Sequence, residues 1–271
     1  MRALEQIDAW AAEHAAAGVV SRDGVLATRG DSARAFRWAS VTKLLTACAV
    51  LVAAEEGTVD LDEPAGPPGS TVRHLLAHAS GLPFEGDAPI ARPGRRRIYS
   101  NAGFDTLGEF VSSRTEMPFA EYLAGAVLEP LGMHGTELRG SPAKDAWGPL
   151  RDLLGFAQEL LAPRLVAAET LDEATRVAFP GLAGLLPGYG RQQPMDWGLG
   201  FELKDSKAPH WTGSRNSPWT FGHFGGSGTF LWIDPGAGLA LACLTDREFG
   251  SWALGAWPAL SDAVLAELSL R

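Results

Sequence analysis

Residues 36–43 read FRWASVTK and lead directly into the apolar stretch 41–56, VTKLLTACAVLVAAEE. That stretch holds no Gly or Pro and stops at Gly57, a helix-ending signal. Its apolar residues fall on most faces, so the pattern predicts a buried helix. Ser40 and Lys43 form an S-x-x-K pattern at its start. Because positions i and i+3 share a helical face, the Lys43 side chain can reach the Ser40 hydroxyl.

This pairing suits nucleophilic catalysis. A serine hydroxyl is a poor nucleophile until a base stands beside it. We expect Ser40 to open the helix, where free backbone N–H groups favour developing negative charge. Lys43 acts as a base only while neutral, and burial or nearby positive charge favours that form. The alternative is an ordinary N-capping serine with an exposed lysine, and so short a pattern does not decide between the two.

A second pattern, Tyr99-Ser100-Asn101, lies just before a predicted helix over residues 101–119. A tyrosine held near cationic groups has a lowered pKa and can shuttle protons. An asparagine side chain can hydrogen-bond a substrate amide. The alternative is a buried tyrosine followed by an N-capping asparagine.

A third pattern, HFGGSGT over residues 223–229, is expected to enter a strand. Glycines in a strand let a ligand or another backbone approach closely. A backbone N–H in this run can supply one arm of an oxyanion hole, with the Ser40 amide as the other. A flexible turn is the alternative. A phosphate-binding loop is excluded because no Gly-Lys-Ser/Thr ends the run.

The remaining elements are expected in the order helix, strands, helical block, strands, helix. An amphipathic helix is expected ahead of Gly18, with Leu4, Ile7, Trp10 and Ala11 on one face. A hairpin is expected at Asp23-Gly24, with a further strand over 35–38. The other predicted helices cover 72–78, 121–128, 150–161, 169–177 and 252–270. The other predicted strands cover 197–203, 228–233 and 239–245.

Strands at both ends of a chain pair readily into one antiparallel sheet. The expected fold class is therefore α+β, with N- and C-terminal helices flanking that sheet and a mostly helical inserted lobe. We expect a single two-lobed domain over 1–271, with a sheet lobe (1–39 and 196–271) and a helical lobe (40–195). A ligand cleft is expected where the lobes meet.

Composition excludes several classes of protein. With 23 Lys and Arg against 32 Asp and Glu, the net charge of −9 argues against nucleic-acid binding, which needs a basic face. No apolar run approaches the ~18 residues of a membrane helix. Cys48 and Cys243 sit in apolar stretches and are expected to pack in the core. Acidic residues interrupt the first 20 positions, so we expect no signal peptide and a cytoplasmic protein. The expected partner is a small-molecule substrate, with no nucleic acid and no membrane. The oligomeric state stays open.

In this order, S-x-x-K, Y-x-N and H-x-G resemble the serine β-lactamase and penicillin-binding protein superfamily. The similarity is to its class C-like branch, which also holds D-alanyl-D-alanine carboxypeptidases, D-aminopeptidases and esterases. Three further segments resemble family sequences: LLAHASGLP at 75–83, Pro93-Gly94 before the tyrosine, and WGLGF at 197–201. The likeness runs over roughly residues 17–245 and implies a β-lactamase/transpeptidase-like fold.

The resemblance implies a role for each matching residue. Ser40 is the implied acylated nucleophile, and Lys43 and Tyr99 handle its proton and that of the leaving group. The implied substrate-binding residues are Asn101, His223, Phe224 and Gly225. The implied oxyanion hole consists of the N–H groups of Ser40 and Gly226. No cofactor and no metal are expected.

Two departures from the family bear on the substrate. Class C-type lactamases read K-T-G where this chain has His223-Phe224-Gly225. A neutral histidine anchors a carboxylate less well than a lysine, so we expect weak or no β-lactam turnover. The sequence thus predicts a serine hydrolase acting on an ester, an amide or a D-amino-acid derivative. An acyltransferase using the same site and a catalytically silent binding protein of the same fold are the alternatives.

Three other features have plainer interpretations. His74 and His78 stand four apart, but no Glu follows His74, so a zinc site is not expected, and His78 is expected to hydrogen-bond backbone. The run Arg95–Arg97 is expected in a solvated loop, with steering of anionic substrates as the alternative. Four aromatic residues near position 223 fit a core or an acyl pocket equally well. They are Trp211, Trp219, Phe221 and Phe224.

Overall fold

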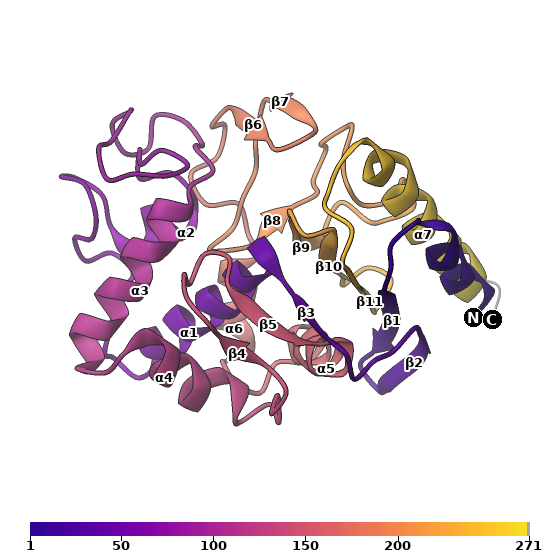
Figure 1. The fold of residues 1–271 in the computed structure, drawn as a ribbon. Coiled ribbons are helices and arrows are strands. Elements are labelled where there is room, and N and C mark those ends of the chain that lie inside the picture. The colour runs from indigo at the N-terminus through magenta and orange to yellow at the C-terminus, as the bar shows by residue number, and fades with distance from the viewer. Residues whose placement is uncertain (270–271) are drawn as a thin grey trace.

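The computed structural model describes residues 1–269, and within them the main sheet has six strands (Figure 1). All neighbouring strands are antiparallel. The first strands of the chain pair with the last, because β1 lies between β2 and β11. In spatial order the strands are β2 (Gly24–Arg29), β1 (Ala15–Ser21), β11 (Leu239–Thr245), β10 (Thr229–Asp234), β9 (Phe221–Gly225) and β8 (Glu202–Leu203).

Both faces of this sheet are covered. Helix α5 (Leu150–Leu161) packs on one face, against β1, β10 and β11. Helix α7 (Ser251–Ser269) and the 3₁₀ helix η1 (Arg2–Ala9) cover the other face (Figure 1). Alternate residues of β11 accordingly enter two different cores, with Ala242 on the α5 side and Cys243 on the α7 side. A strand buried on both sides reads as an unbroken apolar run, as 239–245 does.

The helical part is built around α1 (Thr42–Glu55), which is buried on nearly every face, as its composition predicts. Three elements pack against it: α3 (Asn101–Thr115), α4 (Phe119–Leu123) and the turn η3 (Ala124–Leu128). The helix α3 stops four residues before the predicted end, because Glu116 takes a left-handed φ of 55°. The remaining helices are α2 (Val72–Leu76) and α6 (Ala168–Ala174), and η3 is a π-helical turn.

Two smaller sheets complete the described chain. One has the order β3–β5–β4, with β3 at Ala35–Arg37, β5 at Ala146–Pro149 and β4 at Glu137–Leu138. The other is the hairpin of β6 (Gly184–Leu186) and β7 (Gly190–Gln192). The strand β3 was expected from its sequence, and it carries the chain directly into the turn that holds Ser40.

The α+β architecture with terminal strands in one antiparallel sheet is confirmed. Two local predictions were wrong. The amphipathic N-terminal helix is a 3₁₀ helix that ends at Ala9, and Ala11 is exposed. Of the strand expected over 197–203 only β8 forms. The run 223–229 begins in β9 and, as predicted, enters a strand, because Thr229 is the first residue of β10. The final helix is present through Ser269, and position 270 of that prediction lies outside the described residues.

The lobe division remains a proposal. Helix α5 belongs to the 40–195 range but packs on the main sheet, so the two ranges share a core. Both cysteines are free and buried, as predicted. The chain ends are joined by the Glu267 carboxylate, which accepts hydrogen bonds from the amides of Arg2 and Ala3. Across residues 1–269, every helix falls short of the length or apolarity that crossing a membrane requires.

We predict that Gly225→Ala destabilises the protein. A Cβ atom at Gly225 would lie 2.4 Å from the Trp38 carbonyl oxygen and 3.0 Å from the Ala39 Cβ. Overpacking of this kind costs about 1–3 kcal/mol, measurable as a lower denaturant midpoint at unchanged m-value. The matched control is Gly255→Ala in α7, where a Cβ meets open space and the helix gains about 0.5–1 kcal/mol. Equal midpoints for the two variants would contradict the packing argument.

Candidate active site

Ser40 lies in a short 3₁₀ turn, η2 (Ala39–Val41), just ahead of α1. It is not the N-cap residue that the sequence suggested, because Val41 holds that position and no side chain caps the helix. Ala39 has a left-handed φ of 46°, which is uncommon for a residue with a side chain. The turn therefore presents the Ser40 hydroxyl in a conformation that the surrounding structure must enforce.

Trp38 fixes this turn from both sides. Its backbone N–H donates to Ala146 O at 2.9 Å, and its indole N–H donates to Gly148 O at 2.9 Å. Its carbonyl accepts a 2.8 Å hydrogen bond from the Thr229 hydroxyl on β10. The turn is thus joined to both the small sheet and the main sheet, which brings Ser40 to the β9–β10 hairpin.

The amino group of Lys43 contacts three oxygen atoms within the described chain. Nζ lies 3.4 Å from Ser40 Oγ, 2.6 Å from Asn101 Oδ1 and 2.9 Å from the Ala143 carbonyl. Lys43 is fully buried, and burial lowers its pKa from 10.5 to about 7. The neutral form of Lys43, which a base for the Ser40 hydroxyl requires, is therefore accessible at neutral pH.

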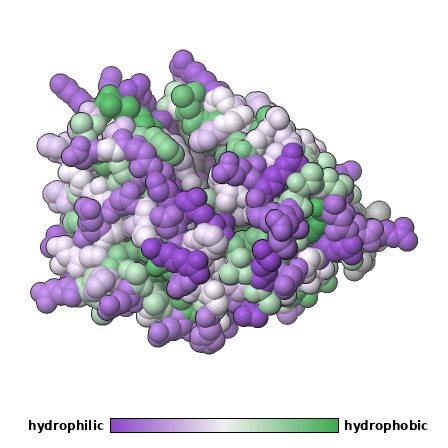
Figure 2. All heavy atoms as spheres, viewed as in Figure 1, coloured by the Kyte–Doolittle hydropathy of each residue, from purple (hydrophilic) through white to green (hydrophobic). Residues whose placement is uncertain are grey.

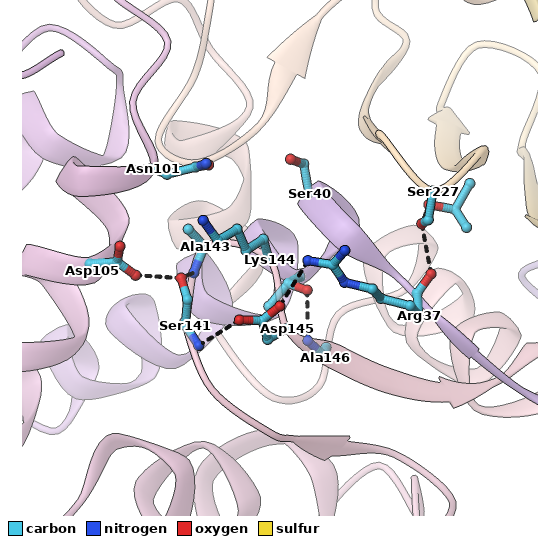
Figure 3. A network of polar contacts seen from close by, with 12 residues as sticks. Arg37, Ser40, Asn101, Asp105, Ser141, Ala143, Lys144, Asp145, Ala146 and Ser227 are labelled. Atoms are coloured by element: carbon cyan, nitrogen blue, oxygen red, sulfur yellow. Dashed lines mark hydrogen bonds and ion pairs between the residues drawn. The ribbon is translucent and has the colours of Figure 1, made fainter. Parts of the chain in front are cut away.

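Residues 141–146 run beside α1 and supply the Ala143 carbonyl. The Thr46 hydroxyl donates to Pro142 O at 2.7 Å, and the Ala146 N–H donates to the Thr42 hydroxyl at 3.0 Å. Figure 3 shows this segment below Ser40 and Asn101, held by ion pairs and hydrogen bonds that involve Ser141 and Asp145. These contacts fix the position of the acceptor that faces Lys43.

Tyr99 lies over the same amino group, with Lys43 Nζ 4.8 Å from its ring centroid. The Tyr99 hydroxyl forms a hydrogen bond with Ser40. The expectation of a lowered tyrosine pKa was wrong, because burial raises the pKa of Tyr99 and outweighs the Ser40 hydrogen bond. Tyr99 is therefore a protonated hydroxyl that can pass a proton along hydrogen bonds rather than a phenolate base.

His78 and Ser100 set the position of Tyr99. The Ser100 side chain caps α3 by accepting from the Gly103 N–H at 2.9 Å, while the Ser100 N–H donates to His78 Nδ1 at 3.1 Å. The His78 ring lies 4.7 Å from the Tyr99 ring, centroid to centroid. The expected backbone hydrogen bond of His78 is confirmed, and it links the end of α2 to the start of α3.

Asn101 has hydrogen-bond partners on both ends of its amide. Oδ1 accepts from Lys43, and Nδ2 donates to Glu85 Oε1 at 2.9 Å. Glu85 Oε1 also accepts from Lys144 Nζ at 2.8 Å. In this state the Asn101 amide orients the lysine, and a substrate amide would have to displace Glu85 to reach Nδ2.

His223 is a neutral residue in a buried position. Its Nδ1 donates to the Phe224 carbonyl at 2.6 Å, since a carbonyl can only accept. Nε2 is then the unprotonated nitrogen, and it has no partner within residues 1–269. Burial, reinforced by the nearby Lys43 charge, lowers the His223 pKa to about 3. The residue therefore offers no positive charge to a substrate carboxylate at neutral pH.

Ser40 stands between two hollows. One is a narrow pocket of about 160 Å³, mostly aromatic and aliphatic. The other is an open groove of about 550 Å³ with several charged side chains at its edge, among them Arg34, Lys144 and Glu248. The pocket is lined by Ser40, Phe84, Tyr99, Leu186, Pro187, Trp197, Glu202, His223, Phe224, Gly226 and Phe249. Gly226 lines both hollows together with Ser40.

The structure assigns different places to the four aromatic residues for which the sequence left both a core and an acyl-pocket role open. Phe224 lines the narrow pocket, whereas Trp211 and Phe221 lie in the two cores. Trp219 is 75% exposed and lies neither in the pocket nor in a core.

On the face shown in Figure 2, hydrophilic and hydrophobic residues are interspersed.

The arginine run is only partly solvated, and the prediction for Arg97 was wrong. Its guanidinium is buried and donates to four carbonyl oxygens, including Met195 O at 3.0 Å and Ala178 O at 2.7 Å. Arg97 therefore joins the loop before Tyr99 to residues 178–195. Arg95 and Arg96 are exposed.

Several residues of the site carried no recognisable sequence signal. Ala143 contributes only its carbonyl, which any residue has. Glu85 is an exposed and Lys144 a half-buried charged residue on loops, and Leu186 and Phe249 come from distant segments. Within the described chain, the cluster with metal-ligand spacing is Glu13, His14 and Asp246, where His14 already pairs with Asp246. It lies outside the Ser40 pocket.

Comparison with known proteins agrees with this geometry. The chain belongs to the Beta-lactamase family, whose profile matches residues 8–264. The crystal structure of a β-lactamase from Mycobacterium bovis is 58% identical, covers 98% of each chain and superposes with a TM-score of 0.97. EstCE1, a hydrolase with promiscuous acyltransferase activity, is 16% identical over 97% of each chain, with a TM-score of 0.82.

A curated relative matches over a shorter stretch. The D-alanyl-D-alanine-carboxypeptidase/endopeptidase AmpH of Escherichia coli is 29% identical over 143 residues, 39% of this chain. The match spans 37% of the length of AmpH, so the two share part of their sequence only. The family and its β-lactamase/transpeptidase-like fold are thereby established for this chain.

We predict that the Lys43 amino group titrates near pH 7 in the folded protein. Burial without a carboxylate in contact disfavours its charged form. The measurement is a ¹³Cε NMR titration, with the Lys43 resonance assigned by its loss in Lys43→Arg. Lysines on the surface provide the internal control, because they titrate near 10.4. A Lys43 midpoint above pH 9 would contradict the burial argument.

Proposed function

We propose that this protein is a serine hydrolase that cleaves a small ester, amide or D-amino-acid derivative through an acyl-enzyme on Ser40. The observation that carries the proposal is the position of the Ser40 hydroxyl, 3.4 Å from a lysine whose pKa is about 7 and hydrogen-bonded to Tyr99. A weakly basic neutral amine beside a serine hydroxyl is the pairing that nucleophilic catalysis requires.

Acylation follows from these contacts. Neutral Lys43 takes the Ser40 proton while Oγ bonds to the substrate carbonyl carbon. The negative charge that forms on the carbonyl oxygen is accepted by the N–H groups of Ser40 and Gly226. Tyr99, which stays protonated, relays a proton to the departing alcohol or amine as its bond to the acyl carbon breaks. A water molecule then attacks the acyl carbon and gives a proton to Lys43. The bond from the acyl carbon to Ser40 Oγ breaks, the proton passes from Lys43 to Oγ, and the acid leaves.

The two hollows support a division of the substrate. The narrow pocket suits the acyl part, and the open groove suits the leaving group. A volume of about 160 Å³ resembles the ~150 Å³ cavity that holds benzene. The acyl group is therefore compact and uncharged, such as a phenyl or short branched chain.

β-Lactams belong in the substrate panel because a 58% identical relative is called a β-lactamase. The neutral His223 supports weak or no turnover of these carboxylate-bearing compounds. The cytoplasmic location expected from the sequence stays a prediction.

We predict that a fluorophosphonate adds its mass to the wild-type protein and not to Ser40→Ala, as read by intact mass spectrometry.

The rate of ester-driven acylation rises with pH and reaches half its maximum near pH 7, because only the neutral lysine accepts the proton. A wild-type protein that never gains mass, or a Ser40→Ala variant with undiminished esterase activity, would refute the proposal.

We also predict a preference for short acyl groups. The kcat/KM for p-nitrophenyl butanoate or benzoate should exceed that for the decanoate at least about tenfold, since the pocket has no room for a long chain. Phe249→Ala opens the pocket and should narrow this ratio. Trp219→Ala, an exposed aromatic outside the pocket, is the control and should leave it unchanged. Equal rates with all chain lengths would contradict the assignment of the acyl site.

Acyl transfer is a second candidate function, favoured by the open groove beside Ser40, which can admit an alcohol or amine in place of water. EstCE1, which shares the fold, is described as a hydrolase with promiscuous acyltransferase activity. Adding such nucleophiles and measuring how the acyl group partitions separates the two reactions. A silent binding protein is disfavoured by the contacts among Ser40, Lys43 and Tyr99.

A further inference from the structure

Glu85 lies on the loop before α3 and contacts the outer end of the Asn101 amide. Its Oε1 accepts two hydrogen bonds, from Asn101 Nδ2 at 2.9 Å and from Lys144 Nζ at 2.8 Å. Asn101 itself is buried, with 3% of its surface exposed. Neither Glu85 nor Lys144 touches Ser40, so any effect on the nucleophile passes through Asn101.

A carboxylate in this position determines which way the asparagine amide points. The amide can place either Oδ1 or Nδ2 toward Lys43, and the two arrangements have the same shape. Ionised Glu85 can only accept hydrogen bonds, so it requires Nδ2 on its own side. Oδ1 is then directed at Lys43, as observed at 2.6 Å.

This orientation matters most when Lys43 is neutral. A neutral amine has two N–H donors and one lone pair. The Asn101 Oδ1 and Ala143 carbonyl oxygens, at 2.6 and 2.9 Å, can only accept and therefore take both donors. The lone pair remains for the Ser40 hydroxyl at 3.4 Å. A reversed amide would point an Nδ2–H donor at the same lone pair and compete with the serine proton.

The loop backbone is held independently of the Glu85 side chain. The Phe84 carbonyl accepts from the N–H groups of Asn101 and Ala102, and the Pro83 carbonyl accepts from the Ser100 hydroxyl at 2.6 Å. A substitution at Glu85 therefore removes the partner of the amide and leaves the loop in place.

We propose that Glu85 is a positioning residue for the general base: its carboxylate holds the Asn101 amide with Oδ1 toward Lys43, which reserves the lysine lone pair for the Ser40 proton. This inference rests on the proposed function, because it assigns Lys43 the role of base.

The test compares Glu85→Ala with Glu85→Gln. Glutamine keeps one carbonyl oxygen, and a single oxygen accepts both hydrogen bonds in the present structure. We expect the acylation rate at its high-pH plateau to fall about tenfold or more in Glu85→Ala, the order expected for losing a charge-assisted hydrogen bond. Glu85→Gln should stay within about threefold of the wild type.

The pH profile gives a second readout. The charged and titratable groups facing Lys43 are Tyr99, His78, His223, Asp105, Glu85 and Lys144. Both Glu85 variants remove a negative charge that favours protonated Lys43, so both should move the acidic limb to lower pH. Glu173→Ala, which breaks another exposed ion pair, to Arg73, is the control and should change neither the plateau nor the limb.

Two outcomes would overturn the inference. One is a Glu85→Ala plateau within twofold of the wild type, and the other is an equal loss in Glu85→Gln and Glu85→Ala. An activity-independent readout is the ¹⁵N shift of the Asn101 side-chain amide, which should move as Glu85 titrates below its usual pKa and stay fixed in Glu85→Gln. Loss of the shift change would refute the Glu85 contact, whereas loss of Ser40 labelling would refute the proposed function.

Discussion

The amino group of Lys43 is fully buried, and within the described chain the oxygens it contacts belong to a hydroxyl, an amide and a peptide carbonyl. A carboxylate at any of these places would stabilise the ammonium form and keep the pKa high. The fold instead delivers neutral acceptors from three separate segments: the turn η2, the start of α3 and residues 141–146. The carboxylates of Asp105 and Glu85 lie nearby but contact other groups, so they raise the pKa of the amine without forming an ion pair with it.

The same avoidance of charge extends to the pocket beside Ser40. Burial keeps His223 neutral, its bond to the Phe224 carbonyl sets which ring nitrogen carries the proton, and Tyr99 stays protonated. Glu202 is ionised, but its carboxylate pairs with Lys207 and His210 and not with Ser40. The buried position of His223 offers no positive charge to the pocket. A site of this kind distinguishes acyl groups by shape and apolar area rather than by ionic contacts.

Much of the fold and the outline of the site could be predicted from the sequence. The S-x-x-K spacing brings Lys43 to Ser40 through local helical geometry, and the apolar run of α1 requires burial. Contacts between distant segments were beyond such reasoning. The Ala143 carbonyl has no side-chain signature, and the burial of Arg97 depends on carbonyl groups brought together only in the folded chain. The sign of the Tyr99 pKa change was missed because burial outweighed the hydrogen bond.

The pairing of β1 with β11 determines when the site can assemble during folding. The His14 N–H donates to Asp246, which lies 232 positions later in the chain. Strands β10 and β9 continue the same sheet on the far side of β11. Contacts so distant in sequence form slowly, because the loop-closure entropy must be overcome before they stabilise the chain. A nascent chain on the ribosome holds Ser40 and Lys43 early but lacks His223 and Gly226. The pocket beside Ser40 is therefore assembled only after residues 239–245 are available to close the sheet.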